Sequence, residues 1–269
     1  MPFSQKTNIK LHYEIQGKGN RILYISGTGG DLRAKPNVLD GPLVKSHQVL
    51  AFDQRGLGQS EKPETDYTMQ EYADDAAQLM EELGWATADI VGVSFGGMVA
   101  LNMAVSHPDK INKLVLCCTS PGGSERASYP LHELPDSLSD ADRICHMISI
   151  NDLRRDAKWQ NDNPTRVEEI IRVTMAMRSA DHQTAEFKAG ARRQLMARSQ
   201  HNVVHVLANI KIPALICAGK YDGMAPAKNQ QTMQELMPSA ELAWFEGGHL
   251  FMIQDKAAWP KIIAFLDVD

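Results

Sequence analysis

The stretch VGVSFGGMVAL, residues 91–101, decides the fold because it sets one hydroxyl at a strand-to-helix corner between glycines. β-forming residues lead into Ser94, and good helix formers lead out. Gly92 and Gly96 complete a G-x-S-x-G pattern in the strand–turn–helix context that gives this motif its meaning. So tight a turn strains the backbone of Ser94, and a Cβ at position 92 or 96 would collide with neighbouring backbone.

This corner presents the hydroxyl for chemistry. It aims a helix N-terminus at Ser94, where backbone N–H groups can hold a negative oxygen. A serine hydroxyl becomes a good nucleophile only when a base removes its proton and a third group orients that base. An acid and then a histidine are therefore expected later in the chain, the order typical of this architecture.

Two later loops supply those residues. Asp222 follows the apolar strand expected at 212–219, and His249 follows the strand expected at 241–246. Loops after parallel strands meet at the ligand-binding edge of an α/β sheet. We expect Ser94 as nucleophile, Asp222 as acid and His249 as base.

Other polar residues compete for these roles. Asp53 also follows a strand, but it precedes Ser94 in the chain and is expected to fix the turn at 55–60. His201 and His205 have the spacing of a metal-binding pair. No glutamate follows the first histidine and no third ligand is evident, so both are expected to be ordinary helix residues and no metal is predicted.

Acyl transfer also needs two hydrogen-bond donors for the oxyanion. The N–H of Phe95, directly after Ser94, is the first candidate. The glycine-rich loop 26–30 follows an apolar strand and offers the N–H of Thr28 as the second. A phosphate-binding loop is the alternative, but no lysine follows at the required spacing, so no nucleotide cofactor is expected.

Strand-like and helical segments alternate along the chain. The expected strands are 8–15, 21–26, 49–52, 89–93, 113–118, 212–219 and 241–246. Apolar runs with helices between them predict a doubly wound, mostly parallel α/β sheet. Residues 121–210 show helical signals and no convincing strand, which predicts a helical cap (lid) inserted into a core of residues 1–120 and 211–269.

Composition narrows the partners and the compartment. The net charge is −5 and no basic run occurs, which argues against nucleic acid or an anionic membrane as partner. The N-terminus lacks the apolar stretch of a secretory signal, and no run is long enough to cross a bilayer. The four cysteines match no disulfide or zinc spacing, so a cytoplasmic protein is expected. A monomer or a homodimer is also expected.

Five motifs together resemble the α/β-hydrolase superfamily across the whole chain. They are GTGG (27–30), DQRGLGQS (53–60), GVSFGG (92–97), GKYDGMAP (219–226) and GGH (247–249). Within the superfamily, the sequence most resembles the 3-oxoadipate enol-lactonase and small carboxylesterase group. The resemblance implies a sheet of about eight strands, a helical cap after the sixth, no cofactor, and the residue roles given above.

The sequence also departs from relatives. Ser26-Gly27 stands where the family usually has His-Gly, which leaves the support of the oxyanion loop open. Ser94 argues against the dehalogenases and epoxide hydrolases, which use aspartate there. Leu250 stands where the carbon–carbon bond hydrolases typically have tryptophan.

The expected activity is hydrolysis of a carboxylic ester or lactone through an acyl-enzyme. The alternatives are an acyl-homoserine-type lactonase, a carbon–carbon bond hydrolase with the same triad, and a ligand receptor of this fold. Met147, Trp159 and Leu250 are expected to contact the small-molecule substrate between cap and sheet. The sequence shows no clustered arginines that would indicate a carboxylate clamp.

Overall fold

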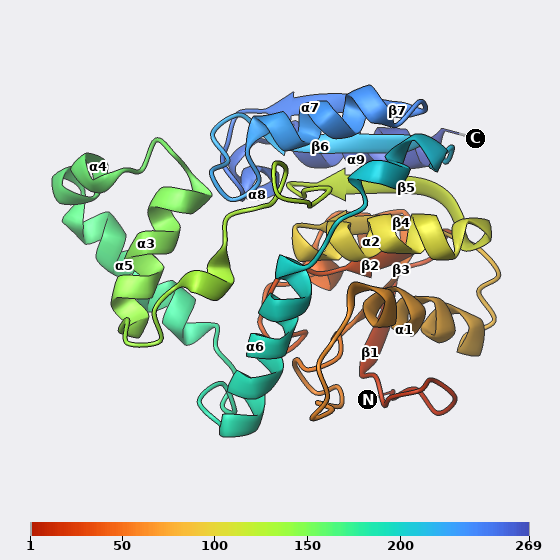
Figure 1. Cartoon of the computed structure of the whole chain (residues 1–269), viewed down its shortest axis with the longest axis horizontal. Coiled ribbons are helices and arrows are strands. Elements are labelled where there is room, and N and C mark those ends of the chain that lie inside the picture. The colour runs from red at the N-terminus through yellow and green to blue at the C-terminus, as the bar shows by residue number, and fades with distance from the viewer. Residues whose placement is uncertain (1, 269) are drawn as a thin grey trace.

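A seven-stranded sheet forms the centre of the computed structural model, which describes residues 2–268 (Figure 1). The strands are β1 (Tyr13–Gln16), β2 (Asn20–Ile25), β3 (His47–Phe52), β4 (Ala88–Val93), β5 (Ile111–Cys117), β6 (Ala214–Gly219) and β7 (Ala240–Phe245). Their order is β1-β3-β2-β4-β5-β6-β7, and only the β1–β3 pair is antiparallel. The doubly wound, mostly parallel fold is confirmed.

The strand count corrects the expectation of about eight. The N-terminal segment pairs through one isolated bridge between Phe3 and His12, which is too little to form a further strand. The insertion that was expected after a sixth strand therefore follows β5, the fifth of the described strands.

Alternate residues of the strands enter two separate apolar cores. In β2, Leu23 and Ile25 face one core, and Ile22 faces the other, as the two-residue period of a strand requires. One core is covered by α1 (Met69–Glu82), α2 (Phe95–Ser106) and α7 (Ala227–Leu236). The other is covered by α8 (Phe251–Gln254), α9 (Ala258–Asp267) and the short turns η1 (Val38–Asp40) and η2 (Leu43–Lys45).

Helices fill the chain between β5 and β6. They are η4 (Leu131–Glu133), α3 (Asp140–Asn151), α4 (Ala157–Asp162), α5 (Pro164–Ala176), α6 (Ala185–Ser199) and η5 (Val204–Asn209). The remaining short turn, η3 (Pro108–Lys110), leads into β5. In Figure 1, α3, α4 and α5 form a lobe beside the sheet, whereas α6 runs beside the core. Within residues 2–268, no helix combines the length and apolar character needed to cross a membrane.

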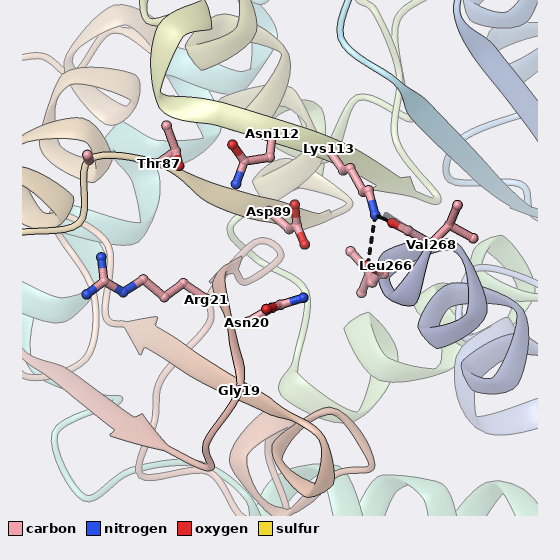
Figure 2. A pocket seen from close by; sticks show the side chains of 10 residues that line it. Gly19, Asn20, Arg21, Thr87, Asp89, Asn112, Lys113, Leu266 and Val268 are labelled. Atoms are coloured by element: carbon pink, nitrogen blue, oxygen red, sulfur yellow. Dashed lines mark hydrogen bonds between the residues drawn. The ribbon is translucent and has the colours of Figure 1, made fainter.

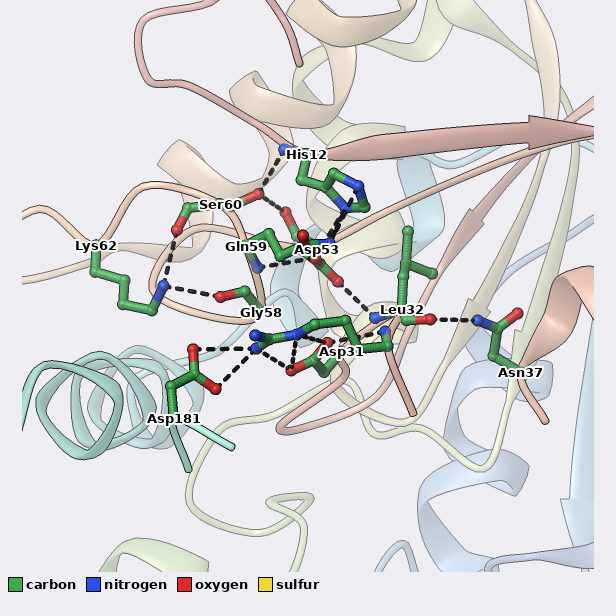
Figure 3. A network of polar contacts seen from close by, with 11 residues as sticks. His12, Asp31, Leu32, Asn37, Asp53, Gly58, Gln59, Ser60, Lys62 and Asp181 are labelled. Carbon is green, nitrogen blue, oxygen red and sulfur yellow. Dashed lines mark hydrogen bonds and ion pairs between the residues drawn. The ribbon is translucent and has the colours of Figure 1, made fainter. Parts of the chain in front are cut away.

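Asp53 organises the loops next to the sheet edge (Figure 3). Its buried carboxylate accepts hydrogen bonds from the N–H groups of Leu32 (2.7 Å) and Gln59 (2.9 Å), and His12 Nδ1 lies 3.0 Å from Oδ2. A Cβ on Gly58 would lie 2.3 Å from the Asp53 carboxyl carbon, so the turn closes directly over this side chain. The expectation that Asp53 fixes the turn is confirmed.

An ion pair joins the core to the cap in the same view. Arg33 Nη2 lies 2.6 Å from Asp31 and 2.9 Å from Asp181, which precedes α6 (Figure 3). Burial opposes ionisation of Asp31, but the hydrogen bonds from Arg33 outweigh it and the pKa of Asp31 falls below its ordinary value. The contact tethers the loop after Gly30 to the cap, although a half-exposed pair of this kind contributes little stability.

The corner at Ser94 has the strained backbone that its motif predicts. Ser94 has φ 54° and ψ −115°, outside the regions that L-residues normally occupy. A Cβ on Gly92 would lie 2.5 Å from the Gly96 carbonyl oxygen, and one on Gly96 would lie 2.0 Å from the Ile25 carbonyl oxygen. The glycines are required because β2, β4 and α2 approach here backbone to backbone.

Replacing Gly96 by alanine is therefore expected to lower the free energy of unfolding by about 3 kcal/mol, since backbone cannot move aside as a side chain can. Urea unfolding measures the effect. Val105→Ala on the exposed side of the same helix is the control and should change stability by less than about 1 kcal/mol. Equal stability of Gly96→Ala and wild type would contradict the close approach.

Candidate active site

Three loops at the carboxyl edge of the sheet bring Ser94, His249 and Asp222 into one hydrogen-bonded chain. Ser94 stands between β4 and α2, Asp222 follows β6, and His249 follows β7. His249 Nε2 lies 2.9 Å from Ser94 Oγ, and His249 Nδ1 lies 2.8 Å from Asp222 Oδ2. These distances allow proton transfer from the hydroxyl to the imidazole.

The acid end of this chain is fixed by backbone. Asp222 is buried, and its Oδ1 accepts hydrogen bonds from the N–H groups of Met224 (2.8 Å) and Ala225 (2.9 Å). Its Oδ2 is left to accept the Nδ1 proton of His249. That hydrogen bond selects the tautomer whose unprotonated Nε2 faces Ser94.

Two backbone amides stand free beside the hydroxyl. Phe95 is the first residue of α2, so its N–H has no acceptor within the helix. Thr28 lines the same cavity as Ser94, and a Cβ on Gly27 would lie 3.4 Å from Ser94 Cβ. Across residues 2–268, neither the Thr28 N–H nor the Phe95 N–H donates to a protein acceptor. Both predicted donors therefore border the hydroxyl.

Two glutamines hold the loop 26–30, in which Ser26 stands where the family usually has histidine. Gln54 Nε2 donates to the Ser26 carbonyl (2.8 Å), and Gln194 Oε1 accepts from the N–H of Gly29 (2.9 Å). Sequence reasoning missed both residues. Gln54 follows Asp53 at a strand end and could have been found, whereas Gln194 lies in α6 with no local signal.

A family model described as the alpha/beta hydrolase fold matches residues 20–256. The chain belongs to this family. A poly(3-hydroxyalkanoate) depolymerase from Ectopseudomonas oleovorans is 28% identical over 91% of this chain and 83% of its own length. A 2-hydroxymuconate semialdehyde hydrolase from Pseudomonas sp. strain CF600 is 26% identical over 95% of this chain and 89% of its own length.

The solved enol-lactonase from Burkholderia xenovorans LB400 has the same fold over nearly all of both chains. Its TM-score is 0.80 at 23% identity, with 99% of this chain and 100% of the other covered. The protein described here is thus a hydrolase of the alpha/beta hydrolase fold.

The hydrolase has a cavity of 430 Å³ above Ser94 and His249. Its wall is mainly apolar and is formed by Leu131, Leu134, Met147, Leu195, Met224, Leu250 and Met252. Met147 and Leu250 were expected there. Trp159 does not line the cavity, so the prediction that it contacts substrate is wrong. Its helix, α4, packs on α5. Gln160 of α4 donates to the Cys145 carbonyl and Ser149 Oγ, on the side of α3 that faces away from the cavity.

Arg143 is the one formally charged side chain among the residues that line this cavity. One of its Nη atoms donates to the Pro135 carbonyl (2.9 Å), and no carboxylate of residues 2–268 lies within 4.0 Å of it. An adjoining hollow of 800 Å³ shares Arg143 and is also lined by Arg178, Lys188 and Arg192 together with Asp136 and Asp140. Arg178 pairs with Asp140, so the charges of this hollow are mixed.

A polar hollow of 460 Å³ lies at the opposite, amino-terminal ends of the strands (Figure 2). Asn20, Asp89 and Lys113 point toward it, and Lys113 Nζ donates to the carbonyls of Leu266 (2.9 Å) and Val268. None of the predicted site residues lines this hollow. The catalytic candidates therefore concentrate at the other edge of the sheet.

The histidine pair forms no metal site. His205 lies in η5, whereas buried His201 lies in the preceding loop between Asn102 Nδ2 (3.1 Å) and the Ser120 carbonyl (3.1 Å). Across residues 2–268, no three potential ligands cluster for a metal ion. Burial lowers the pKa of His201 to about 4, so the ring stays neutral in the folded protein at neutral pH.

This burial predicts acid sensitivity. Between about pH 6.5 and pH 4 the unfolded chain holds a proton on His201 that the folded protein does not, so the free energy of unfolding falls as the pH is lowered. The loss reaches up to about 3 kcal/mol. His201→Gln, whose side chain keeps one donor and one acceptor but does not titrate, should lose less stability between pH 7.5 and pH 5 in urea unfolding. The same loss in both proteins would contradict this assignment.

Proposed function

We propose that the protein is a serine hydrolase that cleaves a carboxylic ester or lactone through an acyl-enzyme. The hydrogen-bonded chain from Ser94 through His249 to Asp222 carries this proposal. Two free amides beside Ser94 and the enol-lactonase-like fold support it.

In the first half of the reaction, Ser94 Oγ attacks the carbonyl carbon while His249 Nε2 takes the hydroxyl proton. Asp222 stabilises the resulting imidazolium through Nδ1–H. The carbonyl oxygen becomes an oxyanion held by the amides of Thr28 and Phe95. When the tetrahedral intermediate collapses, the C–O bond breaks and the alcohol oxygen takes the proton from His249.

In the second half, His249 removes a proton from water, and the hydroxide attacks the acyl carbon. Collapse of the second intermediate breaks the bond to Ser94 Oγ, which recovers its proton from His249. The products are a carboxylic acid and an alcohol. In a lactone both groups stay on one molecule, because the leaving alcohol is tethered to the acyl chain.

Replacing the reacting groups tests this mechanism. By analogy with a serine protease in which these roles were measured, Ser94→Ala and His249→Ala should lower kcat by ~10⁶ and Asp222→Ala by roughly 10⁴. The assay is hydrolysis of p-nitrophenyl esters and lactones, with mass mapping of the residue that a fluorophosphonate modifies. Ser106→Ala, at the other end of α2, is the control. Near-normal turnover by Ser94→Ala would refute the mechanism.

The cavity wall indicates the shape of the substrate. Apolar side chains surround Ser94, so the acyl or alcohol part next to the scissile bond should be apolar. Arg143 has free donors in this wall and is suited to an anionic end of the substrate.

Paired esters test the role of Arg143. We expect the p-nitrophenyl monoester of adipic acid to be preferred over p-nitrophenyl hexanoate, which has the same chain length without the terminal carboxylate. Arg143→Gln should reduce that preference in kcat/KM by about tenfold, the value of one charge-assisted hydrogen bond. Arg172→Gln, on α5 and outside both cavities, is the control. An unchanged preference would remove Arg143 from substrate recognition.

A further inference from the structure

One face of the cap helix α6 touches three loops of the site. Gly190, Gln194 and Arg198 follow one another at four-residue spacing and therefore lie on the same side of the helix. All three are buried. Each contacts a different loop, so the helix spans three loops at the active-site edge of the sheet.

The first contact is a close approach of two backbones. A Cβ on Gly190 would lie 2.1 Å from the Gly56 carbonyl oxygen, so α6 rests directly on the turn that Asp53 organises. Just beyond the carboxyl end of the helix, His201 contacts the core through Asn102 Nδ2 (3.1 Å) and the Ser120 carbonyl (3.1 Å). The helix is thus held to the core within its length and beyond its carboxyl end.

The third contact reaches the loop that holds the acid. Arg198 Nη1 donates to the Tyr129 carbonyl (2.8 Å), and Nη2 lies 3.4 Å from Met224 Sδ. The N–H of Met224 in turn donates to Asp222 Oδ1. Arg198 therefore contacts the side chain of Met224, whose N–H makes one of the hydrogen bonds that fix the Asp222 carboxylate.

The middle contact lies at the oxyanion loop. Gln194 is fully buried, and its Oε1 accepts the hydrogen bond from the N–H of Gly29. The Gly29 N–H lies in the peptide plane between Thr28 and Gly29, and the Thr28 N–H lies in the preceding plane, two rotatable bonds away (φ and ψ of Thr28). Gln194 holds the first of these planes, and Gln54 holds the Ser26 carbonyl before the second, so together they restrict the direction in which the Thr28 N–H points.

We propose that Gln194 is a positioning residue: from the cap it sets the orientation of the Thr28 amide toward the oxyanion. This inference rests on the function proposed above, because it assigns to Thr28 a part in oxyanion binding. Gln54 holds the loop from the Ser26 side, and Gln194 holds it from the Gly29 side.

The direct test is Gln194→Met, which keeps the side-chain length and removes the acceptor. Loss of a complete oxyanion donor costs 10²–10³-fold in kcat, so misorienting one should cost at least about tenfold. KM should stay within about twofold, because the ground-state carbonyl gains little from the donor. The midpoint of the kcat/KM profile against pH should not move, since His249 and Asp222 are untouched.

Gln194→Asn supplies a second variant that keeps a polar amide in place but is too short to reach Gly29. It should show the same loss of kcat. Hydrogen exchange of the peptide covering residues 26–31 should accelerate in both variants. Gln200→Met, at the exposed end of α6, is the matched control and should behave as wild type.

A kcat within about twofold of wild type in either folded variant would overturn the proposal. Unchanged hydrogen exchange at residues 26–31 would also overturn it, and so would a shifted pH midpoint. Fluorophosphonate labelling of wild-type Ser94 is scored separately. Failure to label Ser94 counts against the proposed function itself, whereas normal labelling with a normal Gln194→Met enzyme counts against Gln194 alone.

Discussion

The close approach of β2, β4 and α2 at Ser94 is the constraint on which the rest of the site depends. Ser94 can hold its strained backbone because Gly92 and Gly96 let the neighbouring chain segments touch. Strain of this kind persists only where surrounding structure enforces it. Thr119 adds a hydrogen bond from Oγ1 to the Ser94 carbonyl (2.7 Å), so the far side of the corner is fixed as well.

The corner by itself presents only the Ser94 hydroxyl. Asp222 and His249 lie beside it because a parallel sheet brings the loops after its strands together at one edge. Asp222 accepts two backbone hydrogen bonds, and His249 Nδ1 is hydrogen-bonded to Asp222. The cap then completes the surroundings, since Gln194 of α6 holds the loop 26–30 and other cap residues line the cavity. Preorganisation of this sort is what electrostatic catalysis requires.

Sequence reasoning succeeded where one local pattern fixes one local geometry. The G-x-S-x-G corner, the turn at Asp53 and the alternation of strands and helices are determined by residues close together in the chain. It failed where helices from distant segments pack. Trp159 lies away from the cavity because α4 packs on the outer side of α3, and no spacing in the sequence reveals that arrangement. The position of Arg143 in the cavity wall and the Gln194–Gly29 contact arise in the same way.

The most direct measurement is a high-resolution crystal structure of the protein after reaction with a fluorophosphonate, whose phosphonyl oxygen mimics the oxyanion. We expect a covalent bond from phosphorus to Ser94 Oγ, with the phosphonyl oxygen about 2.7–3.1 Å from the N–H groups of both Thr28 and Phe95. An adduct on another residue, or a phosphonyl oxygen turned away from both amides, would contradict it.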